Sequence, residues 1–153
     1  MPSVKMKRLK DGTKELNRIT KSFRGRSKVK VGFPRGTSDD VLNRAVYNEF
    51  GTDGGGWGGP IPERPFMRNG LRDGVGEINS VSRVVGKQLI RGKITRRAAL
   101  TKLGVKGQQL IQKSITSMNS PANSEVTVKM KGSSNPLIDT GEMRGAVTYK
   151  VEE

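Results

Sequence analysis

The sequence contains no histidine and no cysteine. Without histidine, the chain lacks the commonest general base, the commonest metal ligand and the usual switch of physiological pH. Without cysteine, it has no disulfide, no thiol nucleophile and no thiolate ligand for zinc. These absences disfavour an enzyme, so we expect no catalytic residue, no metal site and no cofactor.

Apolar and aromatic residues are also few, at 32% and 5% of 153 residues. A chain of this length suits one domain with a modest core, so we expect neighbouring subunits to supply part of its stability. No apolar run approaches membrane-spanning length, and the N-terminus lacks the apolar segment of a signal peptide. We therefore expect synthesis in the cytoplasm and no contact with a membrane.

Positive charge, by contrast, is abundant: the formal net charge is +15, and much of it lies near the N-terminus. The candidate contacts with DNA or an acidic partner are Lys5, Lys7, Arg8, Lys10, Lys14, Arg18, Lys21, Arg24 and Arg26. Such a field suits nucleic acid, an acidic protein surface or a solvated basic face. Charge alone does not choose among the three.

Helical periodicity accounts for most of the chain. The predicted helices cover residues 11–23, 41–50, 65–91 and 95–117, and a short one ends near residue 146. Thr95 is the expected N-cap of the helix that follows it, and Asp139 with Glu142 fits a capping box at the short helix. The two long helices meet at Gly92, and the sequence leaves open whether they form a hairpin or run end to end.

Alternating polar and apolar residues predict strands over residues 28–33 and 148–151. Residues 125–131 also alternate and could form a strand, although a short helix is possible. We therefore predict an α+β fold, in which a small antiparallel sheet is packed by several helices, including a long central helical region.

The expected organisation is a basic N-terminal helix (residues 1–27) followed by a single α+β domain (28–153), with an extended Gly/Pro-rich arm at 51–65. Closely spaced prolines stiffen the second half of this arm and favour an extended backbone. The arm is expected to dock on a neighbouring subunit; the alternative is that it covers the chain's own core. The candidate docking residues are Trp57, Ile61, Pro62, Arg64, Pro65, Phe66 and Met67.

Two stretches imitate enzyme motifs. Residues 137–141 match the Asp-Thr-Gly loop of aspartic proteases, but too little chain follows to build the rest of such a site. Gly54, Gly56 and Gly59 have the spacing of a dinucleotide-binding loop, but a predicted helix precedes them and Pro60 follows. Neither stretch changes the expectation that the protein is not an enzyme.

Several short sequence motifs, taken in their order along the chain, resemble those of one protein family. They are Val31-Gly32-Phe33-Pro34, Ala45 to Thr52, Ile61 to Arg68, Lys131-Gly132 and Asn135 to Met143. Their arrangement resembles the tail-completion or neck proteins of tailed bacteriophages, a group that includes head–tail joining, minor tail and virion-morphogenesis proteins. The resemblance covers Val29 to Val151.

The resemblance implies a structural virion protein, assembled in the host cytoplasm, that completes the tail or joins it to the head at the neck. It implies a homo-oligomeric ring, expected to be a hexamer, around the DNA channel. The expected partners are adjacent neck, tail terminator or tail tube proteins, with genomic DNA in the lumen. The rival interpretation is a nucleic-acid-binding protein that uses the basic N-terminal region.

Overall fold

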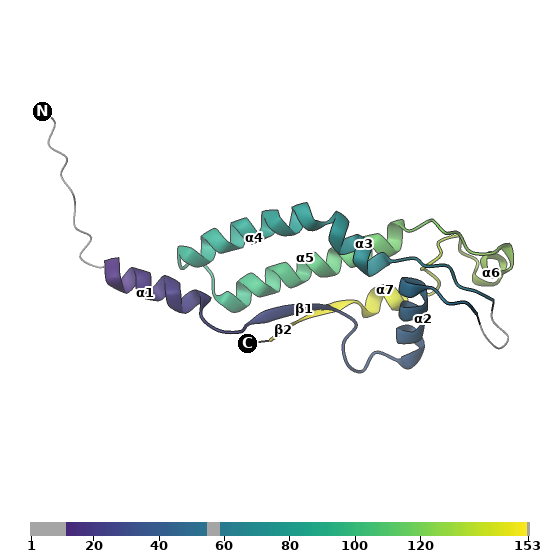
Figure 1. The fold of residues 1–153 in the computed structure, drawn as a ribbon, viewed down its shortest axis with the longest axis horizontal. Coiled ribbons are helices and arrows are strands. Elements are labelled where there is room, and N and C mark those ends of the chain that lie inside the picture. The colour runs from purple at the N-terminus through teal and green to yellow at the C-terminus, as the bar shows by residue number, and fades with distance from the viewer. Residues whose placement is uncertain (1–11, 55–58, 153) are drawn as a thin grey trace, which may run out of the picture.

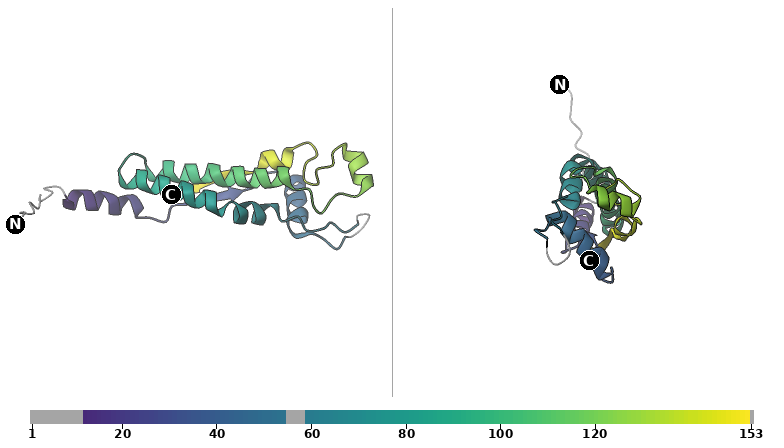
Figure 2. Two further views of the ribbon diagram at one scale, coloured as in Figure 1. Left: turned by 90° about the horizontal axis from the view of Figure 1, so that it is seen from above. Right: turned by 90° about the vertical axis from the view of Figure 1, so that its right-hand side faces the viewer.

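The computed structural model describes residues 12–54 and 59–152. The elements are α1 (Gly12–Phe23), β1 (Lys28–Gly32), α2 (Asp39–Phe50), α3 (Phe66–Asp73), α4 (Val75–Ile90), α5 (Arg96–Ser117), α6 (Glu125–Lys131), α7 (Glu142–Ala146) and β2 (Thr148–Glu152). The molecule is elongated: α4 and α5 run along the sheet, α1 lies at one end, and α2, α6 and α7 lie at the other (Figures 1 and 2). This arrangement confirms the predicted α+β fold with a small antiparallel sheet.

The two strands pair antiparallel, with Val31 opposite Tyr149. Val29, Val31 and Tyr149 face α5, where two glycines lie against them. A methyl carbon added at Gly104 would lie 2.5 Å from the Tyr149 ring and 2.9 Å from Val29, and one at Gly107 would lie 2.9 Å from Val31. Glycine at these two positions therefore lets the helix pack directly on the sheet.

The helices α4 and α5 lie side by side as a hairpin, which settles the alternative that the sequence left open (Figure 1). Gly92 makes the turn in the left-handed region, at φ 68°. Thr95 is the N-cap of α5, as predicted, because its hydroxyl accepts a hydrogen bond from the Ala98 amide at 3.1 Å.

The helical region expected over residues 65–91 consists of two helices, α3 and α4, which meet at Gly74. The backbone of Gly74 departs from helical geometry, with ψ near 3°. A side chain there would also collide with Leu110 of α5, whose methyl carbons lie 2.4 and 2.5 Å from the added carbon. The break thus lies at a position where the Leu110 side chain leaves no room for a side chain larger than that of glycine.

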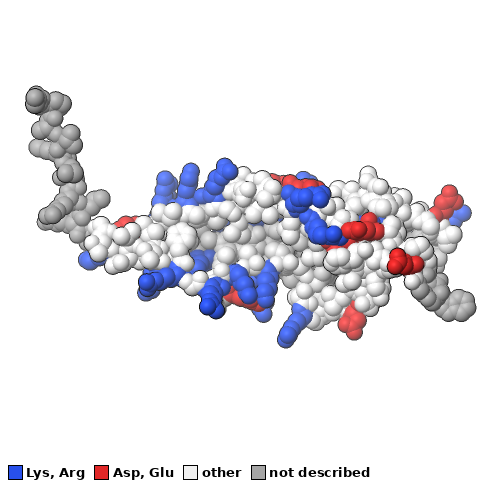
Figure 3. Space-filling model, in the orientation of Figure 1, with Lys and Arg blue, Asp and Glu red and all other residues white. Residues whose placement is uncertain are grey.

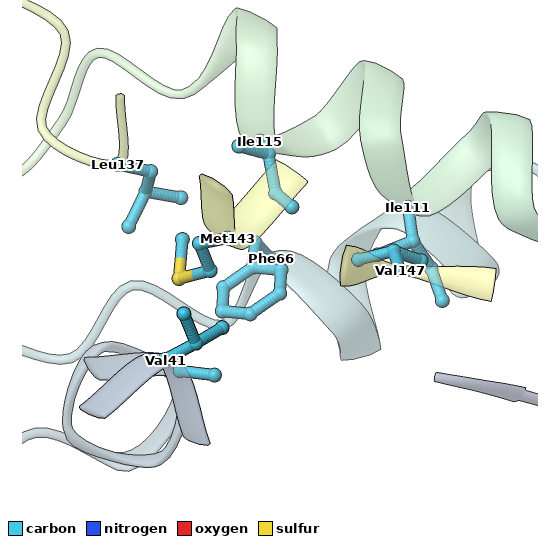
Figure 4. Packing of buried hydrophobic residues seen from close by; sticks show 8 residues of the cluster. Val41, Phe66, Ile111, Ile115, Leu137, Met143 and Val147 are labelled. Carbon is cyan, nitrogen blue, oxygen red and sulfur yellow. The ribbon is translucent and has the colours of Figure 1, made fainter. Parts of the chain in front are cut away.

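The largest fully buried side chains are Phe66, Ile111, Ile115 and Val147. They pack with Val41, Ala45, Leu137 and Met143, as Figure 4 shows. The Phe33 ring meets Phe66 edge to face, with ring centroids 6.4 Å apart. The main core therefore lies where α2, α3 and α7 meet the C-terminal half of α5.

Residues 125–131 form a helix and not a strand, because the Ser124 hydroxyl accepts from the Thr127 amide at 3.2 Å and Gly132 ends the helix at φ 67°.

The short helix α7 exists, but the predicted capping box is wrong. Gly141, at φ 85°, is the N-cap residue, and Asp139 lies outside the helix.

None of the helices in residues 12–54 and 59–152 combines the length and apolarity needed to cross a membrane.

Candidate polyanion-binding surface and docking segment

Lysine and arginine side chains gather at one end of the molecule. We call residues 12–32, 75–106 and 148–152 the basic end; it contains α1, the sheet, α4 and the first half of α5. Its basic residues are Lys14, Arg18, Lys21, Arg24, Arg26, Lys28, Lys30, Arg83, Lys87, Arg91, Lys93, Arg96, Arg97, Lys102, Lys106 and Lys150. Only three acidic residues, Glu15, Glu77 and Glu152, oppose them.

The rest of the described chain, which we call the neutral end, carries equal numbers of acidic and basic side chains. The basic ones are Arg35, Arg44, Arg64, Arg68, Arg72, Lys113, Lys129, Lys131 and Arg144. The acidic ones are Asp39, Asp40, Glu49, Asp53, Glu63, Asp73, Glu125, Asp139 and Glu142. Figure 3 shows this division on one face. The net positive charge of the described residues therefore belongs to the basic end.

Two arginines join α1 to the tip of the α4–α5 hairpin. Arg18 donates to the backbone carbonyl of Ile90, the last residue of α4, where the helix dipole favours a positive charge. Arg96 donates to the carbonyl of Arg24. Arg18 also pairs with Glu15 at 2.6 Å, and this hydrogen bond holds the pKa of the Glu15 carboxyl below its usual range. The cations of α1 thus lie beside those of the hairpin tip.

The five described residues predicted to contact DNA or an acidic partner, Lys14, Arg18, Lys21, Arg24 and Arg26, all belong to the basic end. Arg18 is the least available of them because it is half-buried and already bonded. The other four predicted contacts, Lys5, Lys7, Arg8 and Lys10, lie outside the described residues.

The hairpin tip is the part of the basic end that sequence reasoning missed. Lys87, Arg91 and Lys93 are exposed there, and no carboxylate among the described residues pairs with them. A signal was present in the sequence, because residues 91–97 read Arg-Gly-Lys-Ile-Thr-Arg-Arg across a predicted turn. Only the fold shows that this run joins the N-terminal cations on one surface.

The described part of the proposed docking segment, residues 61–67, is bound largely to its own chain. Arg64 is 3% exposed. Its guanidinium donates to the backbone carbonyls of Pro121 at 2.7 Å and Ala122 at 3.0 Å, and to the side-chain oxygens of Asn48 at 3.0 Å and Asn123 at 3.2 Å. The segment is therefore fastened to the loop before α6.

A second group of hydrogen bonds, to Glu49, holds the start of α3 in place. The carboxylate of Glu49, which is 4% exposed, accepts from the backbone amides of Met67 at 2.9 Å and Arg68 at 3.1 Å. It also accepts from Arg68 Nε at 3.0 Å. An anion at these first amides of a helix is favoured by the helix dipole and by charge-assisted hydrogen bonding.

These contacts correct part of the docking prediction. Phe66 is fully buried in the core and Arg64 is buried in its hydrogen-bond network, so neither side chain is free to anchor a partner. Pro62 is exposed, while Ile61, Pro65 and Met67 are half-buried. Ile61 is held by a two-way backbone bridge to Thr52, at 2.9 and 3.0 Å. Trp57 lies outside the described residues.

Several apolar side chains are more exposed than Ile61, Phe66 and Met67. Those on α2, α4 and α6 include Val46, Tyr47, Phe50, Val75, Val84, Val126 and Met130, and Leu16 and Phe23 of α1 are exposed as well. Met130 and Val126, one helical turn apart on α6, are 84% and 67% exposed. These faces are better candidates for contact with neighbouring subunits than the buried part of the docking segment.

No group of acidic side chains in the described part of the chain is arranged to hold a metal ion. Glu49 and Glu63 instead bind Arg68. Asp139, which the sequence places in a protease-like motif, is an exposed residue of the turn that leads to α7.

Comparison of the chain with protein-family models, curated protein sequences and solved structures gives no match.

Proposed function

We propose that the chain is a structural subunit of a tailed-bacteriophage virion, which completes the tail or joins it to the head at the neck. The subunits assemble as a ring, with six copies expected, around the DNA channel. One observation supports this proposal most directly: the net charge of residues 12–54 and 59–152 is confined to one end of an elongated molecule.

A ring has an inner and an outer side, and an elongated subunit with two different ends suits it. In the proposed ring the basic ends face the lumen, where DNA neutralises their mutual repulsion. The neutral ends and the exposed apolar side chains of α2 and α6 face neighbouring subunits or the adjacent neck, tail terminator or tail tube proteins. Contacts of this heterologous kind close into rings.

The contribution of the basic end is tested by DNA binding as a function of salt. A triple variant, Lys87→Gln with Arg91→Gln and Lys93→Gln, removes three exposed cations of the hairpin tip. We expect the slope of log affinity against log salt to become shallower by up to about 2.7, because each phosphate contact contributes about 0.9. The matched control is Arg35→Gln with Arg72→Gln and Arg144→Gln, which removes three exposed cations of the neutral end. Equal effects of the two triple variants would rule out the basic end as the DNA contact.

The virion role needs its own measurement. Mass spectrometry of virions purified from the phage that encodes this chain should detect the polypeptide, and electron microscopy should place a ring at the head–tail junction or tail end. Virions without the polypeptide would refute the proposal.

The second candidate is a free nucleic-acid-binding protein, which the charge of the basic end also favours. The two candidates differ in assembly. Native mass spectrometry of the purified chain with duplex DNA should show a closed ring for the virion subunit. Single copies on DNA, with steep salt dependence and no ring at any protein concentration, would favour the second candidate.

A further inference from the structure

Helix α2 leaves a row of apolar side chains exposed, which we call the α2 stripe. Val46 and Phe50 lie one helical turn apart with Tyr47 beside them, and the three side chains are 51%, 65% and 45% exposed. Val41 and Ala45 mark the opposite, buried face of the helix. Exposed aromatic side chains grouped with an aliphatic one are typical of the centre of a protein interface.

Helix α6 carries a second row, the α6 stripe. It consists of Val126 and Met130, which are the most exposed large apolar side chains of the described residues. Glu125 and Lys129 lie beside them and are exposed as well. The α6 stripe is therefore apolar with one acidic and one basic neighbour.

The two stripes of one chain face away from each other. Both helices lie at the neutral end (Figure 1), and both line one cavity, to which α2 contributes Arg44 and Asn48 and α6 contributes Thr127 and Lys131. No residue of either stripe lines this cavity. At about 100° per residue, the stripes lie on other faces of their helices. Each stripe therefore needs a second molecule to cover it.

The exposed charges beside the stripes are complementary in one orientation. Asp39 lies on the same face of α2 as Val46, two turns earlier. Asp39 and Lys129 form no ion pair within residues 12–54 and 59–152. Antiparallel packing of α6 on α2 brings Lys129, in the last turn of α6, toward Asp39. Parallel packing would instead bring Glu125 toward Asp39, and these like charges repel.

Contacts between two identical stripes satisfy the chain less well. Two α2 stripes would offer Asp39 only Arg68, which lies over the Phe50 ring at 5.2 Å and is already paired with Glu49 and Glu63. Two α6 stripes would bury few side chains and leave the aromatic rings of α2 exposed. A contact of α2 with α6 covers both stripes at once.

We propose that the α6 stripe of one copy of this chain packs antiparallel on the α2 stripe of the next copy. Because the two faces differ, each copy uses both of them, and a heterologous contact of this kind closes into a ring. This inference rests on the ring of the proposed function and names the faces that build it. Five side chains are too few for a standard-size interface, so one contact is weak and ring closure strengthens it.

The test mixes two variants, each of which lacks one stripe. The first is Val46→Gln with Phe50→Gln, and the second is Val126→Gln with Met130→Gln. Glutamine is a good helix former and leaves the net charge unchanged, and circular dichroism checks that each variant is folded. Assembly is measured by sedimentation velocity without DNA, at about 0.5 M salt to screen the basic ends.

We expect each stripe variant alone to be monomeric, and an equimolar mixture of the two to form one-to-one dimers and nothing larger. In that dimer the intact α6 stripe of the first variant binds the intact α2 stripe of the second. The wild-type chain should form larger species, and so should the control, Val75→Gln with Val84→Gln, which removes two exposed apolar side chains of α4. A mixture or a wild-type chain that stays monomeric at about 1 mM would overturn the proposal. Dimers of either variant alone would also overturn it, because they reveal a contact between identical stripes.

The orientation is tested in the same mixture at about 0.15 M salt. Lys129→Glu, added to the first variant, should weaken the dimer about threefold, and Asp39→Lys, added to the second, should restore it. Lack of restoration would contradict the antiparallel arrangement. The contact and the virion role fail separately: absence from purified virions refutes the role alone, and a monomeric mixture refutes the contact alone.

Discussion

Replacing Gly104 by alanine sets two opposite effects against each other. In a helix interior alanine is favoured over glycine by about 1 kcal/mol, so propensity alone predicts stabilisation. The added carbon, however, would lie 2.5 and 2.7 Å from two atoms of the Tyr149 ring and 2.9 Å from Val29. Normal carbon contacts are about 3.5–4.0 Å, so the helix or the ring must move by about 1 Å.

Overpacking of this kind typically costs about 1–3 kcal/mol, and both the helix and the sheet are fixed by other contacts. We therefore expect Gly104→Ala to lower the free energy of unfolding by about 1–2 kcal/mol, measured by urea denaturation. The control is Gly86→Ala in α4, where the added carbon meets nothing within 4 Å; it should stabilise by up to about 1 kcal/mol. In a Tyr149→Ala background the cost of Gly104→Ala should shrink. A Gly104→Ala variant as stable as the Gly86→Ala variant would refute the close packing of α5 on the sheet.

Four further predictions concern the core, the α3 start, the α5 cap and the sheet. Phe66→Ala should lower the free energy of unfolding by about 3–5 kcal/mol, because it empties a fully buried site. Glu49→Gln should lower the free energy of unfolding by about 2–3 kcal/mol, because it removes the buried charge that binds the first amides of α3. Thr95→Ala should lower it by about 1 kcal/mol, because it removes the N-cap of α5. Urea denaturation measures all three variants. The hydrogen bond from Lys30, and then the charge of Lys30 and the hydrogen bond and charge of Lys28, lower the pKa of Glu152. The interactions of the Glu152 carboxylate with these lysines therefore stabilise the fold above the ordinary carboxyl pKa, and the stabilisation is lost as the pH falls through the lowered pKa of Glu152. Glu152→Gln should accordingly make the melting temperature fall less steeply at acidic pH.

Most elements of the fold were predictable because their signals are local. Thr95 caps α5 as expected, and alternation located both strands. The sequence left residues 125–131 open because valine and threonine alternate there, and the helix is decided by its two ends, Ser124 and Gly132. The break at Gly74 was not predicted; a side chain there would collide with Leu110, which is distant in the sequence.

The sites show the same limit more sharply. A proline-rich segment with Phe66 and Arg64 predicts that the segment docks on a protein surface. The sequence does not say whether that surface belongs to the same chain or to a neighbouring one. Here it does: Phe66 completes the core and Arg64 bonds to the loop before α6. Likewise, the N-terminal cations were evident, but their union with the hairpin tip depends on Arg18 reaching the end of α4.

The unequal charge of the two ends of the chain constrains how copies of it could associate. Bringing two basic ends together in solution is opposed by Coulomb repulsion, which salt screens over about 10 Å at 0.1 M ionic strength. Contacts through the neutral end meet no such opposition, and the exposed Val126 and Met130 of α6 lie there. Assembly without DNA should therefore begin at the neutral end and strengthen with added salt, whereas a DNA-bound assembly should weaken as salt rises. Opposite salt dependences of the two states distinguish a ring that closes around DNA from single copies that merely coat it.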